Sequence, residues 1–386
     1  MAFPDFTLSA GPVTVTPRTQ AALGRPILYH YDPEFQAGFR RTERKVAEIF
    51  RTENDIILMQ GEAIVALEGA LRSLITPGMH VLNLVQGVFG KGTGYWISDF
   101  GAVLHEIQVG YDDAVDPGRV EEYLDAHPEI QMVCLVASET PSGTVTDVAA
   151  IGPMCRERGV LTYVDTVSGV LGMPWETDAW GLDICVAGGQ KCLGGPAGVA
   201  LVSVSPRAWE SIYANPMAPR DSYLSLIDWK EKWLGEGRFP YTPSVSDMYG
   251  LESALDQALE EGIDAVIARH EGAAEVTRAG AQAMGLEFWA VRKEIMSACV
   301  TSIRLPDSID NALVRDHARG VYGVMLSHGQ GAGNLVRLSH MGPTAGGLHS
   351  LIGLAALGRT LADLGVPVDV GDGMDAALAV LSARRV

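Results

Sequence analysis

Short apolar runs alternate with amphipathic stretches through the first half of the chain. The apolar runs predict β-strands, and apolar residues three and four positions apart predict helices between them. Continuous apolar strands joined by helices are typical of a parallel sheet with both faces covered. The predicted strands are 56–59, 81–84, 104–109, 132–136, 161–164, 184–187 and 199–204, with helices at 64–74, 86–98, 118–126 and 206–213.

The pattern changes in the second half of the chain. Residues 220–245 are aromatic and irregular, and a long helical tract at 247–284 carries leucines four residues apart on a core-facing side. The elements predicted after it are strands 287–292, 298–304, 322–327 and 335–338, a helix at 309–319 and two C-terminal helices. We therefore predict a large domain over residues 15–275 and a small α+β domain over 276–386, with residues 1–14 packed nearby.

Charge and composition narrow the classes of partner. The 386 residues include 29 Lys and Arg against 47 Asp and Glu, which gives a net charge of −18. Such a surface repels nucleic acid and anionic lipid, so we expect neither as a partner. No stretch is long and apolar enough for a membrane-spanning helix, and the N-terminus lacks the order of a signal peptide. We therefore expect a soluble cytoplasmic protein.

Cysteine and histidine spacing argues against disulfides and metal. The five cysteines form no CxxC pair and lie mostly in apolar segments, as reduced core residues do. The nine histidines show no HExxH or similar ligand spacing. We therefore expect no metal cofactor.

Two polar residues lie at the ends of apolar strands, where parallel sheets bind their ligands. Lys191 lies among glycines, which let a flat ligand approach the backbone. A desolvated lysine has a lowered pKa and forms a Schiff base with an aldehyde, although a surface lysine is the ordinary alternative. Asp165 could cap the following helix, or it could keep a pyridine nitrogen protonated.

Five motifs in order along the chain resemble those of the class V aminotransferases of fold type I. They are Ala10-Gly-Pro-Val13, Ser138-Glu-Thr-Pro-Ser-Gly143, Asp165-Thr-Val-Ser168, Gly189-Gln-Lys191 and Arg337-Leu-Ser-His-Met-Gly342. One such motif is a weak signal, but the ordered set is specific and spans essentially the whole chain. The resemblance implies an α/β fold with a mostly parallel central sheet in a large domain, plus a smaller C-terminal α+β domain. It also implies pyridoxal 5'-phosphate as the family cofactor, and a homodimer or dimer of dimers whose sites draw residues from two chains.

The resemblance implies roles for individual residues. Lys191 is expected to form the Schiff base and transfer the proton, and Asp165 to bind the pyridine nitrogen. Thr140 is expected to contact the ring hydroxyl, Phe89 to stack on the ring, and Arg337 to bind the substrate carboxylate. Core packing is the alternative for Phe89. The other positions expected to contact the ligand are Glu62, Ala63, Val167, Gln190, Tyr241 and Thr242.

The turn after the first predicted strand departs from the family pattern. Most members have Gly, Ser and Thr there, at a helix N-terminus that suits a phosphate. This chain has Gln60-Gly-Glu-Ala63, with no hydroxyl and with the carboxylate of Glu62, which would repel a phosphate where screening is poor. Glu62 could also be ordinary complementarity to the helix dipole. Tyr241 and Thr242 remain as hydroxyl groups that a partner subunit could supply.

These departures resemble one member group, the pyridoxamine–pyruvate transaminases, which take unphosphorylated vitamin B6 as a substrate. Residues 239–245 and 340–344 fit that group as well. The resemblance implies that pyridoxamine and pyruvate become pyridoxal and L-alanine, with Glu62 bound to the free hydroxymethyl group or a polar neighbour. Phe89 stands where that group has a tyrosine, and an arginine of that group is absent near Gln330. The keto acid could therefore differ from pyruvate, or Arg337 could act alone.

Three alternatives remain. A conventional phosphate-bearing transaminase of the alanine– or serine–glyoxylate type would carry a phosphorylated yellow chromophore. A cysteine desulfurase shares the fold but needs a mobile nucleophilic cysteine, for which Cys299 in a strand-like run is a poor candidate. A B6-sensing regulatory domain needs an attached DNA-binding module, and the chain has no basic helix-turn-helix segment.

Overall fold

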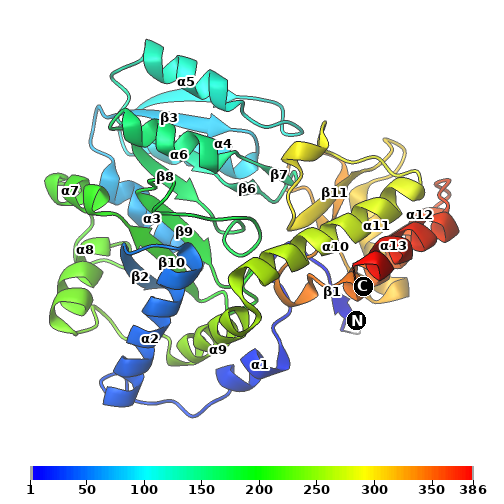
Figure 1. The fold of residues 1–386 in the computed structure, drawn as a ribbon, viewed down its shortest axis with the longest axis horizontal. Coiled ribbons are helices and arrows are strands. Elements are labelled where there is room, and N and C mark those ends of the chain that lie inside the picture. The colour runs from blue at the N-terminus through cyan, green and yellow to red at the C-terminus, as the bar shows by residue number, and fades with distance from the viewer. Residues whose placement is uncertain (1–2, 385–386) are drawn as a thin grey trace.

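The structure, a computed structural model, describes residues 3–384 and is built around one seven-stranded sheet (Figure 1). In spatial order its strands are β2 (Asp55–Gln60), β10 (Val199–Val204), β9 (Ile184–Gly188), β8 (Leu161–Asp165), β5 (Met132–Val136), β3 (His80–Val85) and β4 (Val103–Gln108). β10 pairs antiparallel with both of its neighbours, and the other pairs are parallel. The predicted mostly parallel α/β sheet is confirmed.

Helices pack on this sheet as the sequence pattern predicts. The helices of this part are α1 (Pro17–Leu23), α2 (Pro33–Phe50), α3 (Ala63–Leu74), α4 (Val88–Asp99), α5 (Pro117–Ala126), α6 (Val148–Glu157) and α7 (Pro206–Ala214). α2 and α3 contact β2 and β10, α4 contacts β3 and β4, and α6 contacts β8. Most of them begin at a capping side chain; Asp32, for example, accepts the Glu34 N–H at 2.8 Å in front of a proline at the first position of α2.

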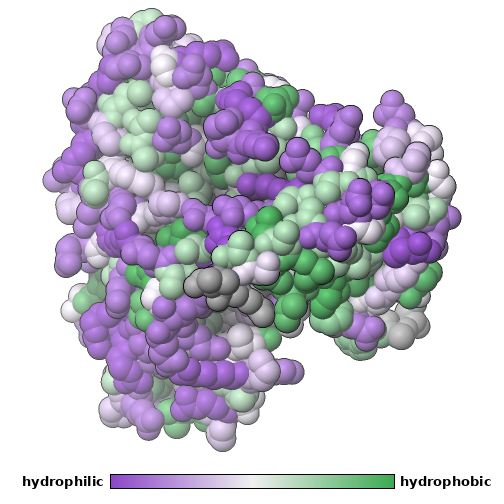
Figure 2. All heavy atoms as spheres, turned by 45° about the vertical axis from the view of Figure 1, so that its right-hand side comes forward, coloured by the Kyte–Doolittle hydropathy of each residue, from purple (hydrophilic) through white to green (hydrophobic). Residues whose placement is uncertain are grey.

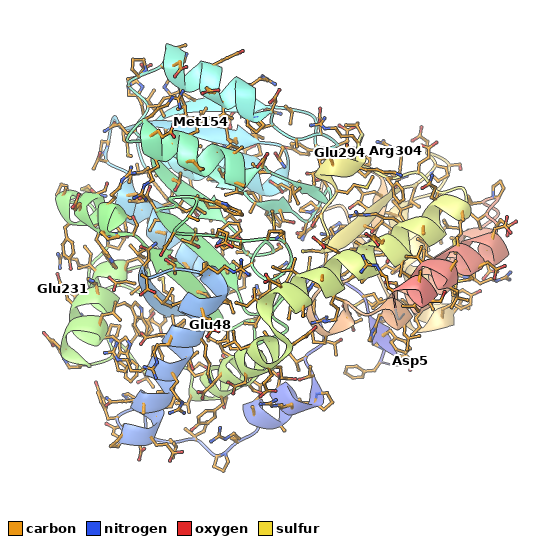
Figure 3. The ribbon with its side chains drawn as sticks, viewed as in Figure 1. Asp5, Glu48, Met154, Glu231, Glu294 and Arg304 are labelled. Atoms are coloured by element: carbon orange, nitrogen blue, oxygen red, sulfur yellow. The ribbon has the colours of Figure 1, made fainter. Side chains whose placement is uncertain are left out.

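A smaller sheet with its own helices forms the other part of the molecule. It consists of β11 (Val300–Arg304), β14 (Leu335–Ser339) and β13 (Ser327–His328), and β1 (Phe6–Thr7) pairs with β12 (Val324–Met325). The helices of this part are α10 (Ile263–Ala283), α11 (Asn311–Tyr322), α12 (Gly347–Asp363) and α13 (Val370–Ala383). In Figure 3, Met154, on α6, lies in the part with the large sheet, and Asp5, near the N-terminus, lies beside the smaller part.

The apolar core is divided into two clusters that match the two parts. Val266 and Val276, one on each half of α10, belong to different clusters, so this helix links them. The N-terminal segment also links them, because Leu8 lies in the smaller cluster and Ala10 in the larger. The domain boundary near residue 275 falls inside α10, and as a boundary between domains it stays a prediction.

Two predicted elements differ from the structure. Residues 287–292 do not form a strand; Phe288 makes only an isolated bridge to Ile303. Backbone bonds at 2.9 Å join Glu287 to Arg304 and Trp289 to Ser302 of β11, but the Val291 N–H then donates to the Asp112 carbonyl of the larger part at 2.9 Å. The predicted strand at 322–327 is confirmed in part, because α11 continues to residue 322 and the short strands β12 and β13 follow.

The helical tract predicted at 247–284 is two helices. α9 (Val245–Glu261) ends at Gly262, whose φ of 93° and ψ of 133° lie outside the helical region, and α10 begins at the next residue. The irregular aromatic segment at 220–245 contains a short helix, α8 (Leu226–Asp228), and a π-helix, Trp229–Gly235. Trp233 anchors the π-helix to α2 by donating to Glu43 at 2.6 Å.

The surface shown in Figure 2 is largely hydrophilic. Hydrophilic side chains cover much of the face shown in Figure 2, and apolar side chains gather over only part of it. Among residues 3–384, no helix is long and apolar enough to cross a membrane.

Substitution of Gly262 by alanine tests the break between α9 and α10. A Cβ there meets no atom within 4 Å, but the backbone conformation is one that only glycine adopts easily, so Gly262→Ala is expected to cost about 1–3 kcal/mol. The matched control is Gly320→Ala in α11, where a Cβ also meets no atom within 4 Å and the backbone is helical, so stability should rise by roughly 0.5 kcal/mol. Thermal melting of the two variants measures the difference, and equal melting temperatures would contradict the assignment.

Candidate active site

The chemistry-bearing residues predicted from the sequence lie at the carboxyl edge of the large sheet. Each is the last residue of a parallel strand or follows one within a few residues. They are Glu62 after β2, Phe89 after β3, Thr140 after β5, Asp165 at the end of β8 and Lys191 after β9. β3, β5, β8 and β9 are parallel, and β2 runs in the same direction because the antiparallel β10 lies between it and β9. Their carboxyl ends therefore lie at one edge, the usual ligand-binding edge of α/β sheets.

Lys191 lies in a tight, largely buried environment. Its Nζ donates to the Ala10 carbonyl at 2.9 Å, so the N-terminal segment reaches the amine. A Cβ on Gly11 would stand 2.5 Å from that Nζ, which explains why glycine is required there. Burial and the nearby Arg337 guanidinium lower the pKa of Lys191, whereas Asp165 acts in the opposite direction. A lowered pKa leaves more of the amine neutral and therefore nucleophilic.

Asp165 is buried at the end of β8. Its Oδ1 accepts the Val167 N–H at 3.0 Å in a turn. The alternative that Asp165 caps a following helix is wrong, because among residues 3–384 no helix lies between β8 and β9. Burial raises the pKa of Asp165 to about 6, while the Val167 N–H and Lys191 act to lower it. A carboxylate of this kind is ready to bind a cation, because a positive partner would offset the cost of burying its charge.

Both carboxylate oxygens of Glu62 have partners within the chain. Oε2 accepts the Ile64 N–H at 2.8 Å and caps the N-terminus of α3, the contact that helix-dipole complementarity predicts. Oε1 accepts the side-chain amide of Gln190 at 2.6 Å. Glu62 is thus linked to the residue before Lys191. Ala63, the first residue of α3, is buried directly behind it.

Arg337 reaches the same edge from the small sheet. It lies on β14 and is buried, and its Nη1 donates to the Thr140 carbonyl at 2.8 Å. Its Nε has no hydrogen-bond partner among residues 3–384. Burial, with Arg315 as a second cause, lowers the pKa of Arg337 to about 10. A buried guanidinium with an unpartnered donor is suited to a carboxylate ligand.

Phe89 begins α4 with its side chain 39% exposed, which argues against core packing. Its N–H donates to Oε2 of Glu139 at 3.2 Å, and the Gly90 N–H donates to Oε1 at 2.6 Å. Glu139 is fully buried and has no role assigned from the sequence. It lies inside the Ser138–Gly143 motif, but the motif does not indicate this long-range contact. The two hydrogen bonds to Glu139 hold in place the backbone that carries Phe89.

Tyr241 and Thr242 are in a different environment from the Lys191 group. The Tyr241 ring stacks on Tyr223 with centroids 4.2 Å apart, and its hydroxyl accepts from the Trp229 indole at 3.1 Å. Thr242 is exposed. Their expected contact with a ligand in a partner subunit stays a prediction.

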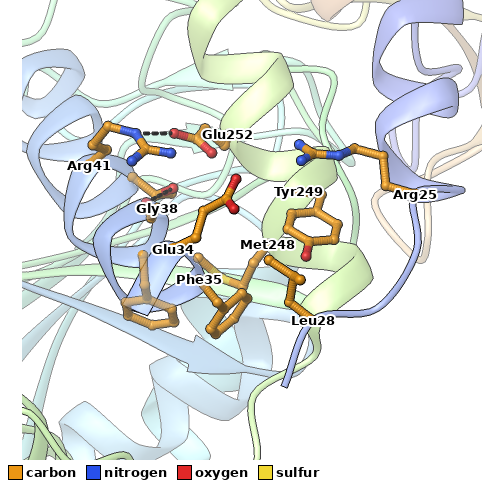
Figure 4. Close-up of a pocket in the computed structure, with 11 residues that line it drawn as sticks. Arg25, Leu28, Glu34, Phe35, Gly38, Arg41, Met248, Tyr249 and Glu252 are labelled. Carbon is orange, nitrogen blue, oxygen red and sulfur yellow. Dashed lines mark hydrogen bonds and ion pairs between the residues drawn. The ribbon is translucent and has the colours of Figure 1, made fainter. Parts of the chain in front are cut away.

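A cavity in another part of the molecule is too small to bind an aromatic ligand. It lies between α2 and α9 and is lined by residues such as Phe35, Tyr249 and Glu252 (Figure 4). Its volume of about 30 Å³ has room for one or two waters and not for an aromatic ring. None of the residues expected to bind a ligand lines it.

The donor set at the sheet edge fits a vitamin B6 ring. It offers an exposed aromatic side chain, a buried carboxylate, a lysine amine with a lowered pKa and a guanidinium with an unpartnered Nε. The side-chain oxygen of Gln190 and the hydroxyl of Thr166, next to Lys191 and Asp165 in the chain, are also buried with no hydrogen-bond partner among residues 3–384. Each of these groups matches one part of an aminated or carbonyl-bearing pyridine ligand with an acid co-substrate.

Comparison with known proteins identifies the class. The profile of the family described as "Aminotransferase class-V" matches residues 18–339, and the chain belongs to this family, whose members depend on pyridoxal phosphate. The chain is 44% identical to the pyridoxamine–pyruvate transaminase of Mesorhizobium japonicum, over 98% of this chain and 97% of that protein. It is 30% identical to the L-aspartate–glyoxylate aminotransferase of Paracoccus denitrificans, over 95% and 93% of the two chains.

Solved structures give the same assignment. The crystal structure of pyridoxamine–pyruvate aminotransferase from Mesorhizobium loti matches with a TM-score of 0.97 at 44% identity, covering 99% of this chain and 98% of that one. The resemblance to class V aminotransferases is thereby confirmed, and the chain is an aminotransferase. A desulfurase nucleophile is not in evidence, because all five cysteines, Cys299 included, are buried free thiols.

Glu139 gives a pH dependence that can be measured. Burial raises its pKa to about 7 against two backbone N–H groups that lower it, so the folded state holds the proton more tightly than the unfolded chain. The contribution of Glu139 to stability is therefore present at low pH and is lost as pH rises from about 4.5 to about 7, by up to about 3 kcal/mol. In Glu139→Gln this decline should shrink, as thermal melting from about pH 5 to about pH 8 would show. Parallel profiles for the variant and the native chain would contradict the assignment, since other buried carboxyls titrate in both.

Proposed function

We propose that this aminotransferase moves an amino group between an unphosphorylated vitamin B6 compound and a 2-oxo acid, converting pyridoxamine and pyruvate into pyridoxal and L-alanine. The observation that carries the proposal is that the Glu62 carboxylate occupies the N-terminus of α3, where the family pattern suits a phosphate. The named relative from Mesorhizobium japonicum supports it.

The energetics of the α3 N-terminus favour a neutral group over a phosphate. Two unit charges about 4 Å apart repel by about 4 kcal/mol at an effective dielectric constant near 20. The helix dipole stabilises an anion by only about 0.3–1 kcal/mol. The Ile64 N–H, which could bind a phosphate, already donates to Glu62. A hydroxymethyl group carries no charge and can donate a hydrogen bond to a carboxylate. Electrostatics therefore select the unphosphorylated vitamin.

The chain's own residues supply the remaining steps. When bound, the B6 ring supplies an electron sink and the carbon that carries the amino group. Lys191 would bind the aldehyde carbon through its neutral amine, with the aldehyde oxygen leaving as water, and would move a proton between the amino-acid α-carbon and the exocyclic carbon of the ring. Asp165 holds a proton on the ring nitrogen, and Phe89 stacks on the ring face. Arg337 orients the acid through its unpartnered Nε.

A conventional phosphorylated cofactor with glyoxylate as acceptor is the second candidate. Its support is the relatedness to glyoxylate aminotransferases such as that of Paracoccus denitrificans. In that case the Tyr241 and Thr242 hydroxyls of a partner subunit would replace the missing phosphate ligands. The first candidate requires an uncharged hydroxymethyl group near Glu62, whereas the second requires a phosphate there.

We also propose a homodimer, or a dimer of dimers, as the working state in the cytoplasm, with a role in breaking down vitamin B6. Support for the dimer comes from large apolar side chains left exposed on or next to the helices that begin at the site. Ile64 is 49% exposed and Tyr95 63% exposed. Surfaces of this kind are commonly covered by a partner.

Half-reactions with pyridoxamine and with pyridoxamine 5'-phosphate distinguish the two candidates. The native chain is expected to react with pyridoxamine about 100-fold or more faster, because a repulsion of roughly 3 kcal/mol has that effect on rate. Glu62→Gln removes the charge and keeps the size, so it should narrow this ratio by about tenfold or more. Pyruvate and glyoxylate are compared as acceptors in each case. If only the phosphorylated form reacts, the phosphate argument is wrong although the chain is still an aminotransferase.

Lys191 is expected to be indispensable. Lys191→Ala removes both the nucleophile and the proton carrier, so turnover should fall by at least about 100-fold and the new absorbance formed with pyridoxal should disappear. Lys293→Ala, at an exposed lysine of the small part, is the matched control and should behave like the native chain. Turnover that is unchanged in Lys191→Ala would overturn the mechanism.

A further inference from the structure

Two histidines lie close together near the amino end of β3, whereas Lys191 lies at the carboxyl ends of the strands. His80 is the first residue of β3, and His105 lies on the neighbouring edge strand β4. The parallel register pairs Leu82 with His105, and residues two apart share a face, so both imidazoles project from the same side. His80 Nδ1 and His105 Nε2 are 3.0 Å apart. Spacing along the sequence gives no sign of this pair, because the register of the sheet creates it.

A carboxylate completes the cluster from a third segment. Glu129 lies in the loop between α5 and β5, and one ligand atom each from Glu129 and the two histidines lie within 4.8 Å of one another. His127 Nδ1 contacts the same carboxylate at 3.0 Å. Tyr123, on α5, contacts His105 Nδ1 through its hydroxyl at 3.1 Å. Three separate elements therefore converge on one point.

We infer that His80, His105 and Glu129 form a binding site for one divalent transition-metal ion of the zinc class, separate from the Lys191 site. Tetrahedral zinc bonds of about 2.0–2.1 Å place two ligand nitrogens roughly 3.3 Å apart, close to the 3.0 Å between the two imidazoles. Two imidazoles and one carboxylate are a common protein ligand set for zinc, with water in the fourth position.

The surroundings of the cluster resemble the outer shell of a metal site. A hydrogen bond from the second ring nitrogen of a ligating histidine orients the ring, and Tyr123 provides that contact to His105. The Tyr123 ring is itself stacked on His127 with centroids 4.3 Å apart.

Such an ion would link the last two strands of the large sheet to a neighbouring loop. β4 is the outermost strand, and the α5–β5 loop that carries Glu129 is a surface connection. An ion bound to both would connect this loop to β3 and β4, toward the amino ends of the strands and away from Lys191. Its effect is therefore expected on stability and not on transamination.

Titration of the full chain, free of any histidine tag and treated first with a chelator, tests the inference. Zinc chloride should bind at one ion per chain with a dissociation constant of about 10 µM or tighter, raise the melting temperature, and leave the transaminase rate unchanged. Cobalt(II) in its place should give the visible absorbance of a tetrahedral site.

Variants assign the ligands. His105→Gln and Glu129→Gln should each weaken zinc binding by about tenfold or more while keeping the melting temperature of the chelator-treated native chain. His317→Ala is the matched control, because His317 contacts a carboxylate, Asp363, at 3.1 Å without a second histidine. Zinc binding that survives in His105→Gln, or no saturable site below about 100 µM, would overturn the inference.

Discussion

The carbonyl of Ala10 receives a hydrogen bond from Lys191 Nζ at 2.9 Å, and this contact joins three parts of the molecule. The Val13 N–H donates to the Gln190 carbonyl at 3.1 Å, while the Ala10 N–H donates to Ser327 of the small sheet at 2.8 Å. Because the lysine is partly buried and bonded to this segment, any displacement of the N-terminal segment would alter its environment. The closeness of Gly11 to the amine leaves no room for a larger residue.

The second constraint is the balance of charge around that amine. Lys191 and Arg337 are the cations, and Asp165, Glu62 and Glu139 are the carboxyls whose charges act on one another. Burial lowers the pKa values of Lys191 and Arg337 and raises those of Asp165 and Glu139. Groups shifted in this way are the ones that exchange protons near neutral pH. A ligand that brings its own pyridinium and carboxylate would complete the set of ion pairs.

The sequence could predict those features that depend on local pattern. Strand positions, and the polar residues that end them, follow from apolar runs and from the geometry of parallel sheets, which is how Asp165 and Lys191 could be found. The antiparallel direction of β10 could not be predicted, because a buried strand has the same apolar pattern in either direction. Residues 287–292 have a strand-like pattern, but the Val291 N–H and the Trp289 indole bond to the larger part, a tertiary contact that local pattern does not contain.

Glu139 illustrates the same limit at the site. Its role depends on accepting two N–H groups about fifty positions earlier in the chain, and nothing around it in the sequence indicates that contact. Phe89 was expected to contact the ligand, and its exposure agrees, but what holds its backbone in place could be learned only from the fold.

Under the proposed function, replacing a phosphate by Glu62 changes how firmly the ligand is held. A phosphate at a helix N-terminus anchors a cofactor through several charge-assisted hydrogen bonds that persist throughout the reaction. Without it, the vitamin is held by stacking on Phe89, by Asp165 and by the bond to Lys191. That bond is absent whenever the amino group resides on the vitamin. One half of the reaction therefore leaves the ligand weakly bound, and a molecule that is released in each cycle is a substrate and not a resident cofactor.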